Sequence, residues 1–497
     1  MKLMLSCFGK KFMNWFDLSV FGFVVLLFVS SCKPVGPDYI TPSPELPDAW
    51  SQQLQSNLEN NPVSNLESWW LVFNDTVLND IITDAKNNNA NLQIAFSRVL
   101  EARADYSGVK GEKLPKSAVS VGISESKMSD NGTFAQVAPA DGFNPQSLFS
   151  TGVNATWEID VFGRVRRSIE ASGYKYEQTI EDYYDVMVVL LADVAKNYIE
   201  LRAYQQMIQN AMQNDTAQTY SLELTKLRYD FGLCSYLDVA QAQYNLAETK
   251  SSIPEFQVKE YLALGRIAVL LGKFRDSLNP ELLNKHPMPV PDSMVTLGIP
   301  ADLLRQRPDI RAKERAIAQA NANIGVATAE LYPTFSLSGF LGFGSKSVTN
   351  LFTIPGLQWG IALPVQWEIF NRKRIRANIA IREYQAEQLL TSYENTVLKA
   401  YTEVDNSIFS YNKQDFKNKF LKEAVEANNE AVSLVHTQYE NGLTDFQNVL
   451  DTERSLYRVQ NKLVEGQSKK LIDLVSIYQS LGGGWPIVQD SIQTMPK

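Results

Sequence analysis

The chain contains two copies of a segment in which a half-apolar strand leads directly into a long polar helix. The first copy opens with WEIDVFGRVRR at Trp157 and the second with WEIFNRKRIR at Trp367. The resulting offset of 210 residues holds to the end of both copies. Upstream, from Pro115 to Pro333, the offset is 218, because the first copy has extra residues in a presumed loop. A register this constant indicates two structural repeats.

Each repeat contains two runs in which apolar residues alternate with small or polar ones. Period-two alternation predicts strands with one apolar face, and we expect β-hairpins at 117–160 and 334–369. Pro364, in the last strand, has no N–H group for a ladder, so a bulge or a missing hydrogen bond is expected there. The four runs read AVSVGIS, GVNATWEID, TFSLSGFLGFG and WGIALPVQWEI.

The helices that follow the strands are unusually long. The span from Val165 to Tyr229 has no proline, and Asn371 to Glu440 has neither proline nor glycine. The second span would measure about 105 Å as one helix. Gly232 and Gly442 should then turn the chain into return helices, with Pro254 breaking or kinking the first. A narrow apolar stripe, with steps of three and four residues, predicts coiled-coil packing of these helices.

The N-terminus has the order of a secretory signal, with lysines, an apolar run and small residues before a cut. The run ends in VSSC, so Cys32 follows two small residues as in a bacterial lipobox. By that resemblance Cys32 becomes the first mature residue and carries lipid; the alternative is a plain signal peptide. We therefore expect a signal peptide at 1–31, a proline-rich tether at 32–75, the first repeat at 76–285, a linker at 286–302, the second repeat at 303–484 and a tail at 485–497.

Composition excludes several classes of function. The net charge is −8, which argues against a nucleic-acid partner because bound phosphates need cations. With two histidines, His286 and His436, a histidine-rich metal site is not expected. No GxSxG, HExxH, phosphate loop or paired Cys/His cluster occurs, so we expect neither an enzyme nor a cofactor apart from the lipid.

The strands have the length of transmembrane β-strands, but four strands cannot close a barrel. An open sheet edge is not viable in lipid. Three chains would supply twelve strands for a closed barrel, which their helices would continue as a tube. The expected fold class is therefore an α+β membrane protein, a trimeric twelve-stranded barrel with a long periplasmic helical barrel. The alternative is a lipid-anchored periplasmic coiled-coil scaffold without a channel, which leaves the four one-sided strands unexplained.

The chain resembles the TolC-type outer membrane efflux proteins, in particular their lipoprotein (NodT-like) branch. The resemblance rests on VGPDYITP after the cysteine, on LLRQRPDIRAKERAI at 303–317, on both strand–helix junctions and on both turn motifs. It implies an outer-membrane homotrimer that is the exit duct of a tripartite pump. The partners would be a periplasmic adaptor (membrane fusion) protein and an inner-membrane transporter, with a proton-driven one favoured. We interpret RPDIR itself as a helix start, with Pro308 and Asp309 at the N-terminus, and not as a site.

The resemblance also assigns roles to the two turns between the long helices. Such turns dock the adaptor's own hairpins, although a glycine is expected in any such turn. The residues concerned are Gly232, Leu233 and Ser235 in the first turn and Gly442, Leu443 and Asp445 in the second.

A periplasmic gate is expected just behind these turns. Asp451 would form a ring of three carboxylates that selects cations, with Gln447 one turn earlier on the same face. In the family, charge-assisted hydrogen bonds link the two helical hairpins, each made of a long helix and its return helix. The residues that look like this link, which we call the clasp, are Tyr439, Arg454 and Asp238. The alternative is that Asp451 and Arg454 are an ordinary solvated pair. The chain departs from some relatives at Asn448, where others carry a second acid, and at Thr444, where others carry arginine.

Overall fold

The computed structural model describes residues 33–43, 47, 58–59, 66–131, 136, 141, 143–291, 295–296 and 306–486. The expected signal peptide, Cys32 and most of the expected C-terminal tail lie outside these residues. The described part forms two compact units. One comprises described residues within 1–42, 100–177 and 314–391, and the other those within 43–99, 178–313 and 392–497. Each unit therefore takes residues from both sequence repeats.

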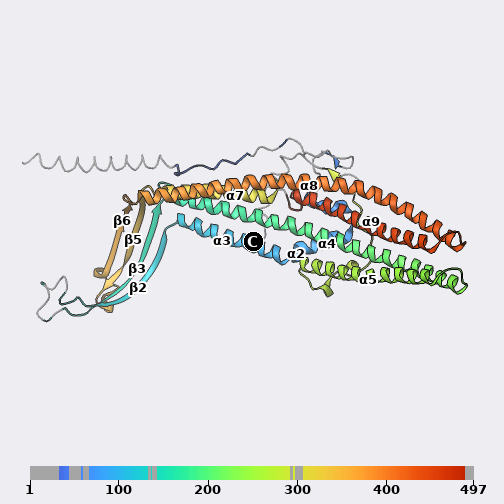
Figure 1. The fold of residues 1–497 in the computed structure, drawn as a ribbon. Coiled ribbons are helices and arrows are strands. Elements are labelled where there is room, and N and C mark those ends of the chain that lie inside the picture. Colours follow the sequence, from blue (N-terminus) through green and yellow to red (C-terminus); the bar gives the residue numbers. More distant parts are fainter. Residues whose placement is uncertain are drawn as a thin grey trace, which may run out of the picture. The chain divides into compact units, whose positions relative to one another are not determined.

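Long helices make up most of the described chain (Figure 1). The predicted long helices from Val165 and Asn371 are confirmed as α4 and α8, the latter with 69 residues. None of the helices in the described part has both the length and the hydropathy of a membrane-spanning helix. The α-helices are α2 (Thr76–Asn88), α3 (Ala90–Lys110), α4 (Arg164–Asp230), α5 (Tyr236–Leu270), α7 (Pro308–Ala329), α8 (Arg372–Glu440) and α9 (Phe446–Ser480). Short 3-10 segments are η1 (Leu66–Phe73), η2 (Gly111–Lys113), η4 (Arg275–Ser277), η5 (Pro280–Leu282), η6 (Val348–Asn350) and η7 (Ile354–Gly356).

Helix α5 continues through Pro254, so of the two outcomes expected there, a break or a kink, the break is wrong. A proline inside a helix removes one backbone hydrogen bond. Here the hydroxyl group of Ser252 contacts both the carbonyl oxygen of Thr249 and, at 2.5 Å, the hydroxyl group of Tyr457 on α9. We infer that packing against α9 keeps the helix continuous where the backbone bond is lost.

The apolar stripe is buried as predicted along most of its length. On α8 and α4 most side chains of this stripe are buried, whereas Tyr401 and Tyr204 are half-buried and Leu390 is exposed. The buried members are Tyr393, Val397, Val404, Ile408 and Tyr411 in the second repeat and Leu190, Val194, Leu201 and Ile208 in the first.

The strands of the first unit form one antiparallel sheet in the order β2-β3-β5-β6, with β7 also paired to β5. Both hairpins expected from the sequence are present, β2 with β3 in the first repeat and β5 with β6 and β7 in the second. Within the described residues, the outer edges of β2 and β6 have no partner strand. The strands are β2 (Lys116–Ser126), β3 (Gln146–Ile159), β5 (Thr334–Ser345), β6 (Leu357–Ala362) and β7 (Val365–Gln366). In the second unit, β1 (Leu58–Glu59) pairs with β4 (Val295–Thr296).

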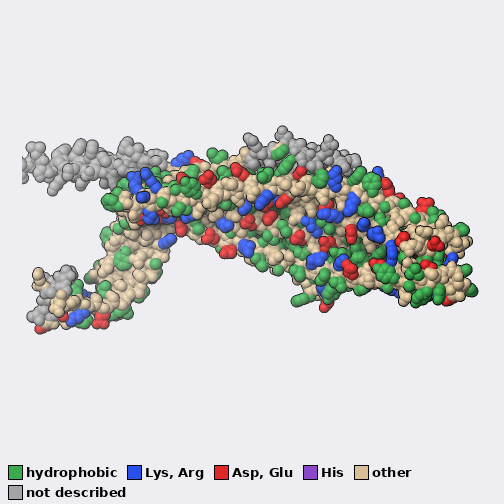
Figure 2. All heavy atoms as spheres, viewed as in Figure 1, with side chains coloured by type: hydrophobic (Ala, Val, Ile, Leu, Met, Phe, Trp, Pro, Cys, Tyr) green, Lys and Arg blue, Asp and Glu red, His purple; other side chains and the backbone are tan. Residues whose placement is uncertain are grey.

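The strand register places apolar and small residues on opposite faces of the sheet. Val119, Val153, Leu341 and Trp359 stand opposite one another across four strands. The next row, one residue along, is Ser120, Gly152, Gly342 and Gln358. On the face drawn in Figure 2 the strands carry mostly hydrophobic and uncharged side chains, while charged side chains gather on the helices.

The apolar face of this sheet is exposed in the single chain. Val121 is 79% exposed, and Ile123, Trp359 and Ile361 are exposed to a similar extent. Monomeric soluble proteins rarely leave so continuous an apolar surface open to water. The sheet therefore requires an apolar environment that the chain itself does not supply.

Pro364 interrupts the last strand as the sequence predicts. The ladder stops at Ala362 and resumes at Val365, so that β6 and β7 are two parts of one expected strand. The carbonyl oxygen of Pro364 still accepts a hydrogen bond from the backbone N–H of Ser336 at 3.1 Å. The gap follows from the missing N–H group of proline.

The two strand–helix junctions share one set of contacts. The indole N–H of Trp157 donates to the carbonyl oxygen of Lys113, and that of Trp367 to the carbonyl oxygen of Leu331. Each following glutamate accepts from an arginine at the start of the helix, Glu158 from Arg164 at 2.7 Å and Glu368 from Arg374 at 2.8 Å. The two sequence repeats therefore form the same hydrogen bonds at their strand–helix junctions.

The RPDIR motif has a structural role, as we interpreted it from the sequence. Helix α7 starts at Pro308, and the buried Arg307 pairs with Asp309 and Glu403. Arg307 also donates to the carbonyl oxygen of Ser480 at 2.7 Å. These contacts fix the start of α7 against α8 and the C-terminus of α9.

Candidate functional site

The candidate site is the pair of turns that join α4 to α5 and α8 to α9. Gly232 and Gly442 have φ angles of +71° and +72°, so the predicted left-handed glycines are confirmed. The backbone N–H of Leu233 donates to the carbonyl oxygen of Arg228, and that of Leu443 to Gln438, each at 2.8 Å. This is the Schellman pattern that ends helices at a left-handed glycine.

Apolar side chains at both turns lie exposed to solvent. Leu443 is 77% exposed and Leu233 is 66% exposed, and Phe231, Tyr236 and Leu237 are also exposed. These side chains form a surface available for contact with another molecule, which we call the tip surface.

The other two predicted turn residues begin the return helices. Ser235 is the N-cap of α5, and its backbone N–H donates to a carboxylate oxygen of Asp238 at 3.0 Å. Asp445 is the N-cap of α9. Ser235 therefore has a structural role at the start of α5, whereas the side chain of Asp445 makes no capping hydrogen bond.

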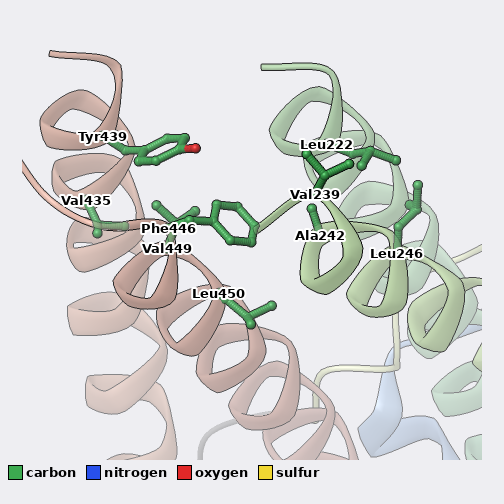
Figure 3. Close-up of a cluster of buried hydrophobic side chains, with 9 residues drawn as sticks. All are labelled: Leu222, Val239, Ala242, Leu246, Val435, Tyr439, Phe446, Val449 and Leu450. Atoms are coloured by element: carbon green, nitrogen blue, oxygen red, sulfur yellow. The ribbon is translucent and has the colours of Figure 1, made fainter. Parts of the chain in front are cut away.

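A cluster of buried apolar side chains lies behind the turns (Figure 3). It joins the two helical hairpins, α4–α5 and α8–α9, which are called the hairpins below. Phe446 at the start of α9 points toward the α4–α5 hairpin, and its ring centroid lies 5.6 Å from that of Tyr439. Apart from Tyr439, whose hydroxyl group also bonds to Thr225 of the other hairpin, the cluster packs one hairpin against the other without directional bonds. Its members are Leu222, Val239, Ala242, Leu246, Val435, Tyr439, Phe446, Val449 and Leu450.

Within the chain, the three residues predicted to form one clasp have separate partners. The carboxylate group of Asp238 accepts from the backbone N–H and the hydroxyl group of Ser235 in its own hairpin. Arg454 crosses to the other hairpin, where its Nε donates to Oδ1 of Asn245 at 3.1 Å. Asp238 follows the N-cap serine by three residues, a spacing that favours a capping box over a long-range contact.

Tyr439 also links the hairpins, but through residues that were not predicted. The Arg228 guanidinium group lies 4.5 Å from the centroid of the Tyr439 ring and donates to the carbonyl oxygen of Tyr439. The hydroxyl group of Tyr439 donates to Oγ1 of Thr225 at 3.4 Å. Burial raises the pKa of Tyr439.

The predicted gate acid Asp451 is exposed and bonded to Gln447. The side-chain N–H groups of Gln447 donate to both carboxylate oxygens of Asp451, at 3.1 and 3.2 Å. The two residues share a helix face, as predicted. Arg454 bonds to Asn245 and not to Asp451. Asn448 and Thr444, the two residues noted in the sequence as departures from some relatives, bond to each other at 2.9 Å.

Sequence reasoning missed Arg228 and Asn245. A basic residue in the last turn of a helix is ordinarily attributed to the helix dipole, so Arg228 gave no distinct signal. Asn245 lies in an ordinary polar stretch of α5. Both residues acquire their roles only because the second hairpin lies beside the first, which a local pattern does not encode.

A second feature is the binding of the N-terminal segment in the first unit. The backbone N–H of Val35 donates to the carbonyl oxygen of Phe162 at 3.1 Å. The buried Arg167 pairs with Asp38 at 2.7 Å. A Cβ atom on Gly36 would lie 2.4 Å from the Cα atom of Gly325, so this crossing requires glycine. The VGPDY stretch is therefore fixed to α4 and α7.

Comparisons with known proteins agree with this arrangement. The chain is 28% identical to nodulation protein T of Rhizobium leguminosarum bv. viciae, over 93% of this chain and 92% of that protein. It is 27% identical to the cation efflux system protein CusC of Escherichia coli O6:H1, over 93% of this chain and 98% of that protein. The solved outer-membrane channel OprN is similar with a TM-score of 0.85 and 32% identity, covering 91% of this chain and 99% of that one.

The sequence profile described as outer membrane efflux protein matches residues 81–273 and 299–483, which is most of both repeats. The matched residues include the long helices, the strands of the antiparallel sheet and both turns described above. The chain therefore belongs to the outer membrane efflux protein family.

Proposed function

We propose that three copies of this chain form the outer-membrane exit duct of a tripartite efflux pump. The observation that carries the proposal is the sheet, whose apolar face is exposed and whose outer edges, on β2 and β6, have no partner in the described chain. In a bilayer every backbone hydrogen-bonding group must be satisfied. Three sheets joined edge to edge would satisfy them as a closed barrel of twelve strands.

The long helices would continue the barrel as a periplasmic tube. The junction favours this because only four residues, from Asp160 to Gly163, separate β3 from α4. The carboxylate group of Asp160 accepts from the backbone N–H groups of Val165 and Arg166, at 3.0 and 2.9 Å. This cap fixes the direction in which the helix leaves the strand. A lipid-anchored scaffold without a channel has no use for such a sheet.

The tube would be closed at rest at the two turns. Asp451 is exposed on the single chain, and three copies converging on the duct axis would form the expected ring of carboxylates. In this proposal Tyr439 and Arg454 hold the hairpins closed through Thr225 and Asn245, and Asp238 contributes by fixing the start of α5. The chain acts as a transport component and not as an enzyme.

The tip surface would be the contact with a periplasmic adaptor protein, which joins the duct to an inner-membrane transporter. Its exposed leucines and aromatic residues support this role because buried apolar side chains supply much of the affinity of protein interfaces. A proton-driven transporter is proposed from the resemblance to the lipoprotein branch alone.

The lipid is proposed to be attached at Cys32. Only Lys33 and Pro34 separate this cysteine from Val35, which is bonded to the end of the junction after β3. A lipid attached there would reinforce the membrane position that the strands favour.

Lipid attachment can be tested by labelling cells with radioactive palmitate. The wild-type chain should incorporate label, and Cys32→Ala should not, because the thiol is the acceptor. Cys234→Ala, which removes the one cysteine of the described chain, serves as the control and should be labelled like the wild type. Equal labelling of the Cys32→Ala and wild-type chains would disprove attachment at this residue.

The lipid-facing side of the sheet can be tested by placing lysine on either face of β2. Val121→Lys should reduce membrane-inserted trimers strongly, because lysine on the lipid face near the bilayer centre costs about 2–4 kcal/mol. Ser120→Lys, on the opposite face of the same strand, should insert normally. Detergent-resistant trimers on electrophoresis, together with outer-membrane fractionation, give the readout. Equal insertion of both variants would contradict the barrel.

Adaptor docking can be tested at the most exposed apolar residue of the tip surface. Leu443→Asp should weaken adaptor binding about tenfold, or about 1.4 kcal/mol, and should lower resistance to exported compounds while trimers still assemble. Leu434→Asp changes another exposed leucine of the same hairpin, 57% exposed and away from the turn, and should have little effect. Unchanged adaptor binding by Leu443→Asp would argue against docking at the tips.

A further inference from the structure

Glu453 on α9 is a buried acid that none of the proposed functions uses. It is 4% exposed, whereas Asp451, two residues earlier on the same helix, is exposed. The two acids therefore point in different directions, Asp451 away from the bundle and Glu453 into it. Acidic residues are rarely fully buried unless they have partners, so the contacts of Glu453 need an explanation.

The carboxylate group of Glu453 contacts one side chain from each of the other three helices at the tips. Ser221 on α4 donates to Oε1 at 2.5 Å, and Asn245 on α5 donates to Oε2 at 3.3 Å. The Nε2 atom of His436 on α8 lies 3.1 Å from Oε1. Ser221 and Asn245 are both 3% exposed. One carboxylate group thus joins all four helices of the two hairpins.

The bonds to Ser221 and Asn245 exist only while the hairpins lie side by side. His436 belongs to the same hairpin as Glu453, but Ser221 and Asn245 belong to the other. No lysine or arginine in the described part of the chain forms an ion pair with Glu453; Arg454 instead bonds to Asn245. Breaking the hydrogen bonds of a buried carboxylate group costs free energy when water cannot replace them. Ser221 and Asn245 therefore favour the arrangement in which the hairpins lie side by side.

The neighbouring apolar cluster cannot supply this specificity. Hydrophobic packing is non-directional and tolerates sliding of one helix on another. Hydrogen bonds to a single carboxylate group fix the position of α9 relative to α4 and α5 to within the tolerance of the bond lengths.

We propose that Glu453 is a positioning residue that holds the two hairpins together when the duct is closed, and that opening breaks its bonds to Ser221 and Asn245. The proposal rests on the proposed function of a gated duct. Glu453 would act behind the Asp451 ring, fixing the helices on which that ring is carried. The roles of the two acids are separable, because one faces the other hairpin and the other is exposed.

The first test is the conductance of purified trimers in planar bilayers. Glu453→Leu should raise conductance severalfold, because it leaves Ser221 and Asn245 of the other hairpin without their shared acceptor. Glu453→Gln keeps a side-chain oxygen for Asn245 and should raise conductance less. Glu465→Gln is the control, since Glu465 is exposed on the same helix and should conduct like the wild type. Asp451→Ala should change cation selectivity without a comparable rise in conductance.

A double-mutant cycle tests whether Glu453 acts through its partner Ser221. Ser221→Ala alone should raise conductance moderately. Combined with Glu453→Leu it should add little, because both changes remove the same bond. Additive effects would show that Ser221 and Glu453 act independently and would overturn the proposed link.

Hydrogen exchange of the trimers gives a readout that does not depend on a pore. Backbone amides at 236–250 and 446–456 should exchange faster in Glu453→Leu than in the wild type, with Glu465→Gln unchanged. A Glu453→Leu variant with the conductance and the exchange of the wild type would overturn the proposal, as would Glu453→Gln trimers as leaky as Glu453→Leu. If wild-type and variant trimers all fail to conduct, the duct itself is wrong, and exchange alone decides whether Glu453 holds the hairpins together.

Discussion

The structure depends on one constraint, which is that backbone groups at the edges of a sheet need partners. Within the described residues, β2 and β6 bound the sheet and their outer edges are unpaired. In water such edges invite aggregation, and in lipid each unpaired group costs several kcal/mol. The exposed apolar row of Val119, Val153, Leu341 and Trp359 adds the requirement for an apolar environment. Both requirements are met if copies of the chain close the sheet within a membrane.

The strand–helix junction then determines how the rest of the chain can be used. The same indole-to-carbonyl bond and the same glutamate–arginine pair occur at Trp157 and at Trp367. Because the junction is duplicated, each β-hairpin of the sheet is followed by a long helix that starts in the same way. At the other ends of these helices the turns repeat too, with left-handed glycines at Gly232 and Gly442. Duplication thus explains why the chain has two similar tips that can differ in their side chains.

Most of the secondary structure could be predicted because it depends on local sequence patterns. The alternation of apolar and polar residues predicted the strands, and the absence of proline predicted the long helices. Pro364 predicted the interruption between β6 and β7. The tips were located by their glycines. At Pro254, where we expected a break or a kink, the helix does not break, and Ser252 contacts Tyr457 on α9 beside it.

The contacts between the hairpins could not be predicted, since they join residues more than two hundred positions apart in sequence. Asp238 was assigned to a clasp by resemblance, but its nearest partner is Ser235, three residues away. Arg228, Asn245 and Glu453 carry no local signal for their roles. Their partners are set by how one hairpin lies on the other, which depends on the packing of the whole bundle.

Closure of the sheet by three chains is the central claim, and disulfide trapping tests it most directly. In a Cys234→Ser background, one cysteine is placed on β2 at Ala118, Ser120 or Gly122 and one on β6 at Gln358, Gly360 or Ala362. Adjacent edge strands bring such residues within the reach of a disulfide. At least one pair should give a covalent ladder that ends at the trimer, while Ser120→Cys paired with Ser338→Cys on the inner strand β5 should give none. The absence of any ladder, or a ladder that continues beyond three chains, would contradict a closed twelve-stranded barrel.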